Sequence, residues 1–231
     1  MTSLNKKEFV AYVRERFSAL LVRHGYSALS RGDSFERRQP PVICGVAFVL
    51  SRDRRTFTPR LGVTLPGQEG TGMVAHRDLP AFKEPGDSSK WWRWSLREEA
   101  SEEIASLLER QGLPWLQQLG NIHNLIEHLE SSKRFPIAPG EVFAGAVSDL
   151  ERHGIRPLHA GSIGAPRPSG PQLRPDVVKH LSHAYEASGD LARALSTWKE
   201  YMSLFKPAAG SGFEAELESR LRMLEDRLAG P

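Results

Sequence analysis

The chain has 231 residues, of which 39% are hydrophobic and 26% are charged, a composition typical of a folded globular protein. Cys44 is the single cysteine, which excludes a disulfide framework within the chain and favours a reducing compartment. The longest apolar run, 42–50, is shorter than the about 20 residues of a membrane-spanning helix, and no secretory signal follows Met1. We therefore expect a cytoplasmic protein without a membrane partner.

The positive charge is concentrated near the N-terminus. Residues 1–60 hold 12 Lys and Arg against 5 Asp and Glu, a net +7, whereas the remaining residues hold 19 against 23, a net −4. Such a basic segment is compatible with an acidic partner, including nucleic acid, but solvated strand faces and turns explain it as well. Because the charge is spread over a helix, turns and strands, we expect nucleic-acid binding to be weak and non-specific.

An amphipathic helix is predicted over 6–24, where apolar residues recur with the 3.6-residue period. Asn5 is placed to cap its N-terminus, and Gly25 follows its last turn as a stop signal.

A β region follows this helix. Segments 26–30 and 35–39 flank a turn and predict a hairpin. Segment 42–51 is apolar on both faces, which predicts an interior strand, and Cys44 within it is expected to be a small core residue. Segment 56–65 alternates like a half-buried strand, and Pro59 favours an edge position. The short connections favour antiparallel pairing.

Residues 66–89 are rich in Gly, Pro, Asp and Ser and predict a long loop, the place where an enzyme of this sequence would hold its site. Residues 90–94 predict a short strand. Ser95 and Glu98 have capping-box spacing and predict a helix that Gly112 ends.

The rest of the chain has a helical pattern, with helices expected from Pro114, interrupted near Gly120, and over 141–153. Residues 154–175 are rich in Pro and Gly and predict an extended linker.

Residues 175–207 resemble one tetratricopeptide repeat, a helical hairpin. The resemblance rests on Val178, Leu181, Ser182, Tyr185, the turn Gly189-Asp190, Ala194, Trp198 and Pro207. Tyr201 departs from the pattern, which has a small residue there. A final helix, 212–228, looks like the solvating helix that ends such arrays. The resemblance implies a peptide-binding groove along the first helix of the hairpin, with Lys179, His183 and Glu186 facing outward. The alternative is that this face is solvated or covered by the protein's own linker.

Residues 5–130 resemble a bacterial family defined only as a domain of unknown function (number 4304). The resemblance rests on Lys7-Glu8-Phe9 at the start of the first helix, His24-Gly25-Tyr26 at its end, and Trp91-Trp92 before an acidic helix. It implies no catalytic residues.

The sequence contains no zinc, phosphate-loop or nucleophile motif. His180 and His183 are spaced i, i+3, but without complementary ligands they do not predict a metal site. Trp91 and Arg93 form a candidate aromatic and basic patch, since aromatic and cationic side chains together bind nucleic acid; the alternative is that this segment packs in the core. We expect no catalytic residue, metal or cofactor.

These patterns predict an α+β fold, in which an antiparallel sheet with flanking helices is followed by an all-helical, repeat-like C-terminal module. We expect an α+β domain over 1–155, a linker over 156–175 and the helical module over 176–231. The function expected is non-enzymatic binding of another protein or peptide, as a bacterial adaptor, regulator or toxin-neutralising partner. The alternatives are nucleic-acid binding by the basic N-terminal quarter and an enzyme with a site near 66–89.

Overall fold

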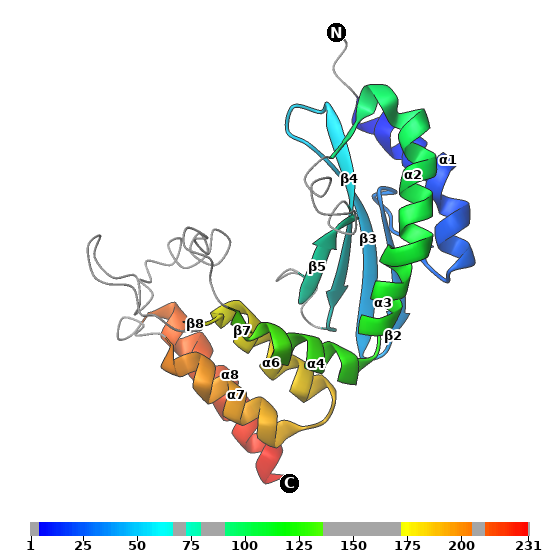
Figure 1. The fold of residues 1–231 in the computed structure, drawn as a ribbon. Helices are drawn as coiled ribbons and strands as arrows, with labels where there is room; N and C mark the ends of the chain where they lie inside the picture. Colours follow the sequence, from blue (N-terminus) through cyan, green and yellow to red (C-terminus); the bar gives the residue numbers. More distant parts are fainter. Residues whose placement is uncertain (1–4, 67–72, 80–90, 136–171, 205–210, 231) are drawn as a thin grey trace. The chain divides into compact units, whose positions relative to one another are not determined.

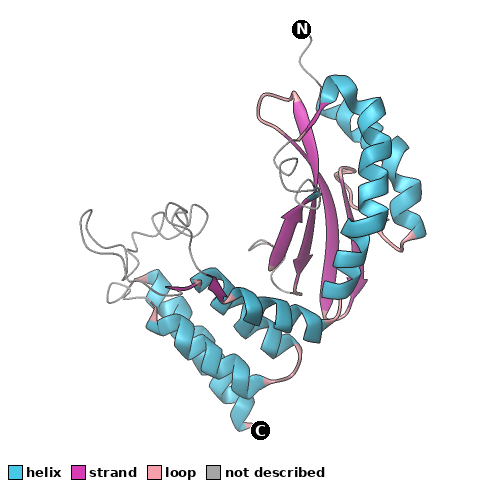
Figure 2. Ribbon diagram, in the orientation of Figure 1, coloured by secondary structure: helices cyan, strands magenta, loops and turns pink. Residues whose placement is uncertain are grey.

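The computed structural model describes residues 5–66, 73–79, 91–135, 172–204 and 211–230. The chain divides into two compact units, residues 1–124 and 125–231. In the first unit a helix-covered antiparallel sheet forms the fold, and the second unit is built of packed helices with one short strand pair (Figures 1 and 2). The fold is α+β, as predicted.

Helix α1 (Lys6–Arg23) confirms the first prediction in both its bounds and its caps. The Asn5 side chain accepts a hydrogen bond from the Lys7 N–H at 3.0 Å. Gly25 follows the helix with a φ of +81°, a conformation that costs glycine little and other residues more. The apolar stripe lies in the core, with Phe17 and Leu21 fully buried.

The sheet has five strands in the order β1-β2-β3-β4-β5, and a sixth, β6, also pairs with β4. All of the pairs are antiparallel. The strands are β1 (Ser27–Ala28), β2 (Ser34–Gln39), β3 (Val42–Leu50), β4 (Thr56–Thr64), β5 (Ala75–Asp78) and β6 (Trp92–Arg93). The hairpin β1–β2 and the interior position of β3 are therefore confirmed.

The edge position predicted for β4 is wrong. β4 pairs with β3 on one side and with both β5 and β6 on the other. Pro59 is tolerated because β6 pairs with residues 56–57 and β5 with residues 60–63, so Pro59 falls between them. Phe48, opposite Pro59 on β3, donates its N–H toward β2, to the Asp33 carbonyl at 2.8 Å. The Phe48–Pro59 pair thus needs no hydrogen bond from proline.

The prediction of a loop over 66–89 is also wrong in part, because β5 lies within it; residues 67–72 and 80–89 are outside the described ranges. The short β5 carries exposed His76 and Arg77, so it lacks the apolar alternation by which a strand is recognised in a sequence.

The helix predicted from a capping box at Ser95 begins differently. A 3-10 turn, Trp94–Leu96, contains Ser95 and leads into α2 (Arg97–Leu107), whose cap has no side-chain hydrogen bond. Gly112 does not end the helix: a π-helical turn, Leu108–Gly112, continues into α3 (Leu113–Leu119). Proline lacks an N–H and crowds the preceding turn, and the wider π turn accommodates Pro114.

Gly112 serves helix–sheet packing instead. A Cβ atom at this position would lie 2.9 Å from the Leu61 Cδ1 and 3.1 Å from the Leu79 Cδ1. The absence of a side chain therefore lets the helix approach the sheet closely. Gly120, at the end of α3, interrupts the helical run as predicted, and α4 (Ile122–Ser132) follows.

Helices α1, α2 and α3 cover one face of the sheet (Figure 1). The core between them is aromatic: Phe9, Tyr12, Phe57 and Trp94 meet edge to face with ring centroids 5.1–6.2 Å apart. Phe17 of α1 stacks on Phe48 of β3 at 4.7 Å. Such rings contribute both buried apolar area and favourable ring geometry.

The second unit contains the predicted helical hairpin, α6 (Pro175–Ala187) and α7 (Leu191–Ser203), with α8 (Gly212–Ala229) packed on α7. Ser182 donates its hydroxyl to the Ala194 carbonyl at 2.8 Å, so these small residues bring the helices together. Leu181, Tyr185, Ala194 and Trp198 are all buried. A two-residue strand pair, β7 (Arg134–Phe135) and β8 (Gln172–Leu173), precedes α6.

The two compact units divide between Asn124 and Leu125, within α4. The domain boundary at 155 and the linker 156–175 fall largely outside the described residues, as does the helix predicted over 141–153. Residues of α4 after Leu125 belong to the helical unit, where Glu130 contacts Tyr185.

Trp198→Ala tests the packing of the hairpin. Trp198 is 2% exposed, donates its Nε1–H to the Leu217 carbonyl at 3.1 Å and packs on Tyr201. The substitution should lower the free energy of unfolding by about 3–5 kcal/mol. The control, Lys199→Ala, removes an exposed ion pair on the same helix and should cost less than about 1 kcal/mol. Equal urea-unfolding midpoints for the two variants would contradict this packing.

Tyr26 and Tyr12 form a matched pair for the sheet unit. The Tyr26 hydroxyl is buried and has no hydrogen-bond partner among the described residues, whereas the Tyr12 hydroxyl donates to the Arg97 carbonyl. Tyr26→Phe should therefore leave stability unchanged or raise it by about 1 kcal/mol, and Tyr12→Phe should lower it by about 1 kcal/mol. Thermal unfolding of both variants measures the difference, and a greater loss for Tyr26→Phe would show that its hydroxyl is satisfied in solution.

Candidate functional site

Helix α6 packs against α7, and its side chains also contact α4 and α8. None of its residues is exposed: six are half-buried, and seven are buried, namely Val177, Val178, Leu181, Ser182, His183, Ala184 and Tyr185. A helix without an exposed residue has neighbours on several sides. The peptide groove that we expected along α6 is therefore largely filled by the protein's own helices.

The side of α6 that carries His183 and Glu186 faces α8. The Arg220 guanidinium lies 2.8 Å from the His183 Nδ1, and Glu186 forms ion pairs with both Arg220 and Arg227. The side chains of His183 and Glu186 are only 9% and 16% exposed. The expectation that these two residues face outward is wrong, because α8 covers them; Lys179 is half-exposed.

His183 is held in its neutral form. Burial is the main cause that lowers the pKa of His183 from 6.5 to about 3, and nearby positive charges lower it further. These charges belong to Arg220, Lys179 and His180. The neutral imidazole can accept a hydrogen bond from Arg220 at Nδ1, which places the ring proton on Nε2.

A second polar group lies where α4 meets the hairpin. The Tyr185 hydroxyl donates to the Glu130 carboxylate, and Lys133 forms an ion pair with Glu200 at 2.6 Å. Burial and the Glu130 charge raise the pKa of Tyr185 to about 12. Tyr185 is therefore a neutral donor at ordinary pH, with a structural role in positioning the helices.

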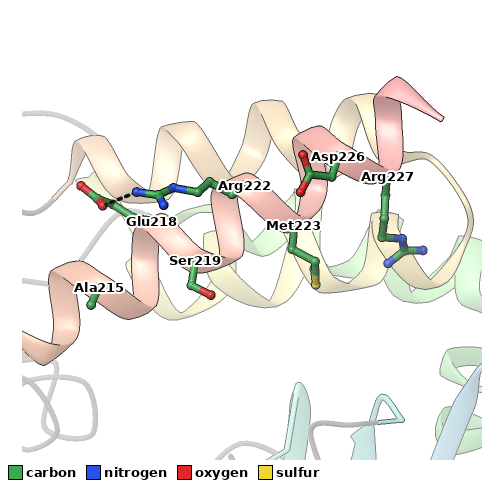
Figure 3. A pocket seen from close by; sticks show the side chains of 7 residues that line it. All are labelled: Ala215, Glu218, Ser219, Arg222, Met223, Asp226 and Arg227. Atoms are coloured by element: carbon green, nitrogen blue, oxygen red, sulfur yellow. Dashed lines mark hydrogen bonds and ion pairs between the residues drawn. The ribbon is translucent and has the colours of Figure 1, made fainter. Parts of the chain in front are cut away.

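The outward face of α8 lines an open hollow of about 490 Å³ (Figure 3). Its lining side chains are Ala215, Glu218, Ser219, Arg222, Met223, Asp226 and Arg227. Glu218 and Arg222 form an i, i+4 ion pair at 3.2 Å along this face. Leu217 and Leu224 are buried on the opposite side. This pattern agrees with the solvating helix expected from the sequence, except that Leu228 is 47% exposed.

In the first unit the Trp91–Trp94 segment is divided between core and surface. Trp92 is buried and donates its Nε1–H to Glu103 at 2.6 Å, and Trp94 belongs to the aromatic core. Trp91 is half-buried and Arg93 is exposed. The structure thus leaves Trp91 and Arg93 as the accessible part of the candidate patch.

The sequence did not reveal that this patch adjoins the turn between β3 and β4. Arg93 pairs with Thr56, and the Trp94 N–H donates to the Arg55 carbonyl at 2.7 Å. Arg52, Arg54 and Arg55 of the turn are exposed. A sequence offers no signal for this neighbourhood, because β6 is a strand of two residues and its partner is separated from it by a long segment.

The β3–β4 turn is organised by Asp53. Its carboxylate accepts hydrogen bonds from the Ser51 hydroxyl at 2.6 Å and from the Arg55 N–H at 3.1 Å, which lower its pKa. Arg54 has a φ of +57°, a conformation that costs most residues about 1–2 kcal/mol and favours glycine or asparagine. An arginine thus occupies the tip of the turn against its backbone preference.

A second hollow, of about 560 Å³, is lined by Gln39, Pro40, Pro41, Gln117, Gly120, Asn121, Ile122 and His123. Gln39 accepts a hydrogen bond from Arg37 at 3.2 Å, and Arg37 packs over the Tyr26 ring. Cys44 is fully buried and donates its thiol to the Leu116 carbonyl at 3.3 Å. Burial raises the pKa of the Cys44 thiol, so Cys44 is an inert core residue, as expected.

Within the described ranges, no three His, Cys, Asp or Glu side chains are grouped closely enough to hold a metal ion. None of the helices in the same ranges combines the length and apolarity that crossing a bilayer requires. Comparison of the chain with protein-family models, with curated protein sequences and with solved structures returns no match. The two resemblances stay predictions that rest on the residues quoted for them.

The stability of the helical unit should depend on pH through His183. The unfolded chain takes up a proton on this imidazole below pH 6.5, but the folded chain resists it until about pH 3. Neutral His183 therefore contributes fully to the free energy of unfolding above pH 6.5. This contribution is lost as the pH falls toward 3, at about 1.4 kcal/mol per pH unit. A protonated ring would face Arg220, and Glu186, 3.9 Å away, already binds two guanidiniums.

Urea unfolding of the wild type and of His183→Gln, at about pH 7.5 and about pH 5, measures this effect. The wild type should lose about 2 kcal/mol more than the variant between the two pH values. Equal losses would show that the imidazole is accessible to protons in the folded state.

Proposed function

We propose that this chain is a non-enzymatic protein–protein interaction module, of the adaptor, regulator or toxin-neutralising class, and that its helical unit binds the partner. The observation that supports the proposal most is that the α6–α7 hairpin already accommodates an amphipathic helix, α8, with defined chemistry. Binding of an amphipathic helix in a groove between helices is a recurrent mode of polypeptide recognition.

The contact with α8 indicates the kind of helix that the groove accepts. Leu217 and Leu224, two helical turns apart, are buried. Arg220 and Arg227, also two turns apart, both bind Glu186. We infer that a partner helix carries leucine and arginine in the same register and competes with α8 for Glu186 and His183.

Lys179 extends this site along α6. It precedes Glu186 by two helical turns, so both side chains lie on the same face, and Lys179 is half-exposed. A partner helix with an acidic residue beyond its arginines would pair with Lys179. Lys179, His183 and Glu186 thus remain the partner-binding residues of the proposal, with the access of a partner to two of them controlled by α8.

The alternative of an enzyme with a site near 66–89 lies mostly outside the described residues. The alternative of nucleic-acid binding has separate support in the sheet unit, from the arginines beside β6.

Affinity purification from the source organism, with quantitative mass spectrometry, tests the proposal. Four forms of the full chain are compared: the wild type, Arg220→Ala with Arg227→Ala, the same pair with Glu186→Gln, and a control with Glu218→Ala and Arg222→Ala on the outward face of α8. Weakening the hold of α8 should increase partner recovery several-fold, and adding Glu186→Gln should abolish the increase. The control should match the wild type, and circular dichroism should show retained helices in every form.

Equal recovery of one protein with all four forms would place the interface elsewhere and remove the groove from the proposal. Recovery of nucleic acid without a protein partner would contradict the proposed function itself.

A further inference from the structure

Sheet pairing gathers four arginines at one corner of the first unit. Arg52, Arg54 and Arg55 lie in the β3–β4 turn, and β6 brings Arg93 beside them through its pairing with Thr56. We call this set, Arg52, Arg54, Arg55 and Arg93, the arginine corner. All four side chains belong to exposed residues.

Arginines of the basic N-terminal segment differ in whether a carboxylate neutralises them. Arg16, Arg23 and Arg60 form ion pairs with Glu98, Glu109 and Asp78, respectively. By contrast, no carboxylate of the described residues forms an ion pair with Arg52, Arg55 or Arg93. These three exposed guanidiniums are therefore accessible to an anionic ligand.

The turn also holds its arginines on a defined backbone. The Asp53 carboxylate is engaged by the Ser51 hydroxyl and the Arg55 N–H, so the acid shapes the turn. Arg54 stands at its tip with a φ of +57°, where asparagine or glycine fits the backbone better.

An aromatic ring accompanies the cations. Trp91 precedes Arg93 by two residues in extended chain, so both side chains point to the same side, and Trp91 is half-buried. A guanidinium binds phosphate through paired N–H donors, and an indole ring stacks on an unpaired base. A single-stranded nucleic acid offers a partner for both groups, a phosphate for each guanidinium and an unpaired base for the indole.

We propose that the arginine corner and Trp91 bind single-stranded nucleic acid, with the arginines on successive phosphates and Trp91 stacked on a base. The site is independent of the groove in the helical unit. It reads the backbone and a base face, so it selects single strands without selecting a sequence.

Fluorescence anisotropy of the full chain with a fluorescein-labelled oligouridylate of about 20 nucleotides tests this site. Four phosphate contacts on a single strand give a log–log salt slope of about −3, so affinity should fall about 50-fold between about 50 and about 200 mM salt. Arg54→Asn with Arg93→Gln should halve the slope, since each phosphate contact contributes about −0.7. Asparagine is chosen because it tolerates the positive φ.

The matched control, Arg110→Gln with Arg222→Gln, removes the same charge from exposed positions elsewhere and should keep the wild-type slope. Trp91→Ala should weaken oligouridylate binding by about 5- to 100-fold, the equivalent of one lost stacked base, and should not change binding of an oligoglutamate of equal charge. Equal slopes for the two arginine variants would overturn the proposal. So would oligoglutamate binding as tightly as oligouridylate, or an absence of saturable binding.

Discussion

Strand β4 is the constraint on which the first unit depends, because β3, β5 and β6 all pair with it. Its helix-facing residues Phe57, Leu61 and Val63 are fully buried. Phe57 anchors the aromatic core beneath α1, and Leu61 sets how closely the helix at Gly112 approaches. The pairing of β6 on the same strand brings Trp91 and Arg93 to the β3–β4 turn. The placement of the candidate nucleic-acid site is thus a consequence of β4 pairing.

In the second unit α6 has the corresponding role, but its constraint is electrostatic as well as apolar. Taking Glu186 and His183 out of water carries a desolvation cost unless both are well paired. The guanidiniums of Arg220 and Arg227 provide that pairing, so α8 contributes charge and apolar surface together. A helix without such arginines would leave the half-buried Glu186 carboxylate unpaired, and this penalty is the basis of the selectivity that we propose for the groove.

The sequence predicted the structure correctly wherever a local sequence pattern agreed with the tertiary environment of the segment. The caps of α1, the two apolar faces of β3 and the Ser182–Ala194 contact of the hairpin were predicted because periodicity and small residues report them directly. Pro59 wrongly predicted an edge strand because its missing N–H falls in a gap between the two partner strands of β4. Gly112 wrongly predicted a helix end because close packing and helix termination both favour glycine. Solvent exposure of His183 and Glu186 depended on α8, whose position relative to α6 no local pattern encodes.

The two candidate surfaces differ in how their charges are balanced, and that difference is the physical basis for assigning them different ligands. In the helical unit the Glu186 carboxylate already forms ion pairs with two arginines of the same chain. A partner of the proposed groove would have to displace these ion pairs, so its affinity would depend on how much better it pairs with Glu186 than α8 does. At the arginine corner the cations are exposed, and Arg52, Arg55 and Arg93 form no ion pair with a described carboxylate, so a phosphate ligand of the proposed site would mainly replace water and counterions there. Exposed charges are screened by salt, whereas the half-buried Glu186 cluster is screened less. Under the two proposals, polypeptide binding at the groove would therefore depend on competition with α8, and nucleic-acid binding at the corner would depend on ionic strength.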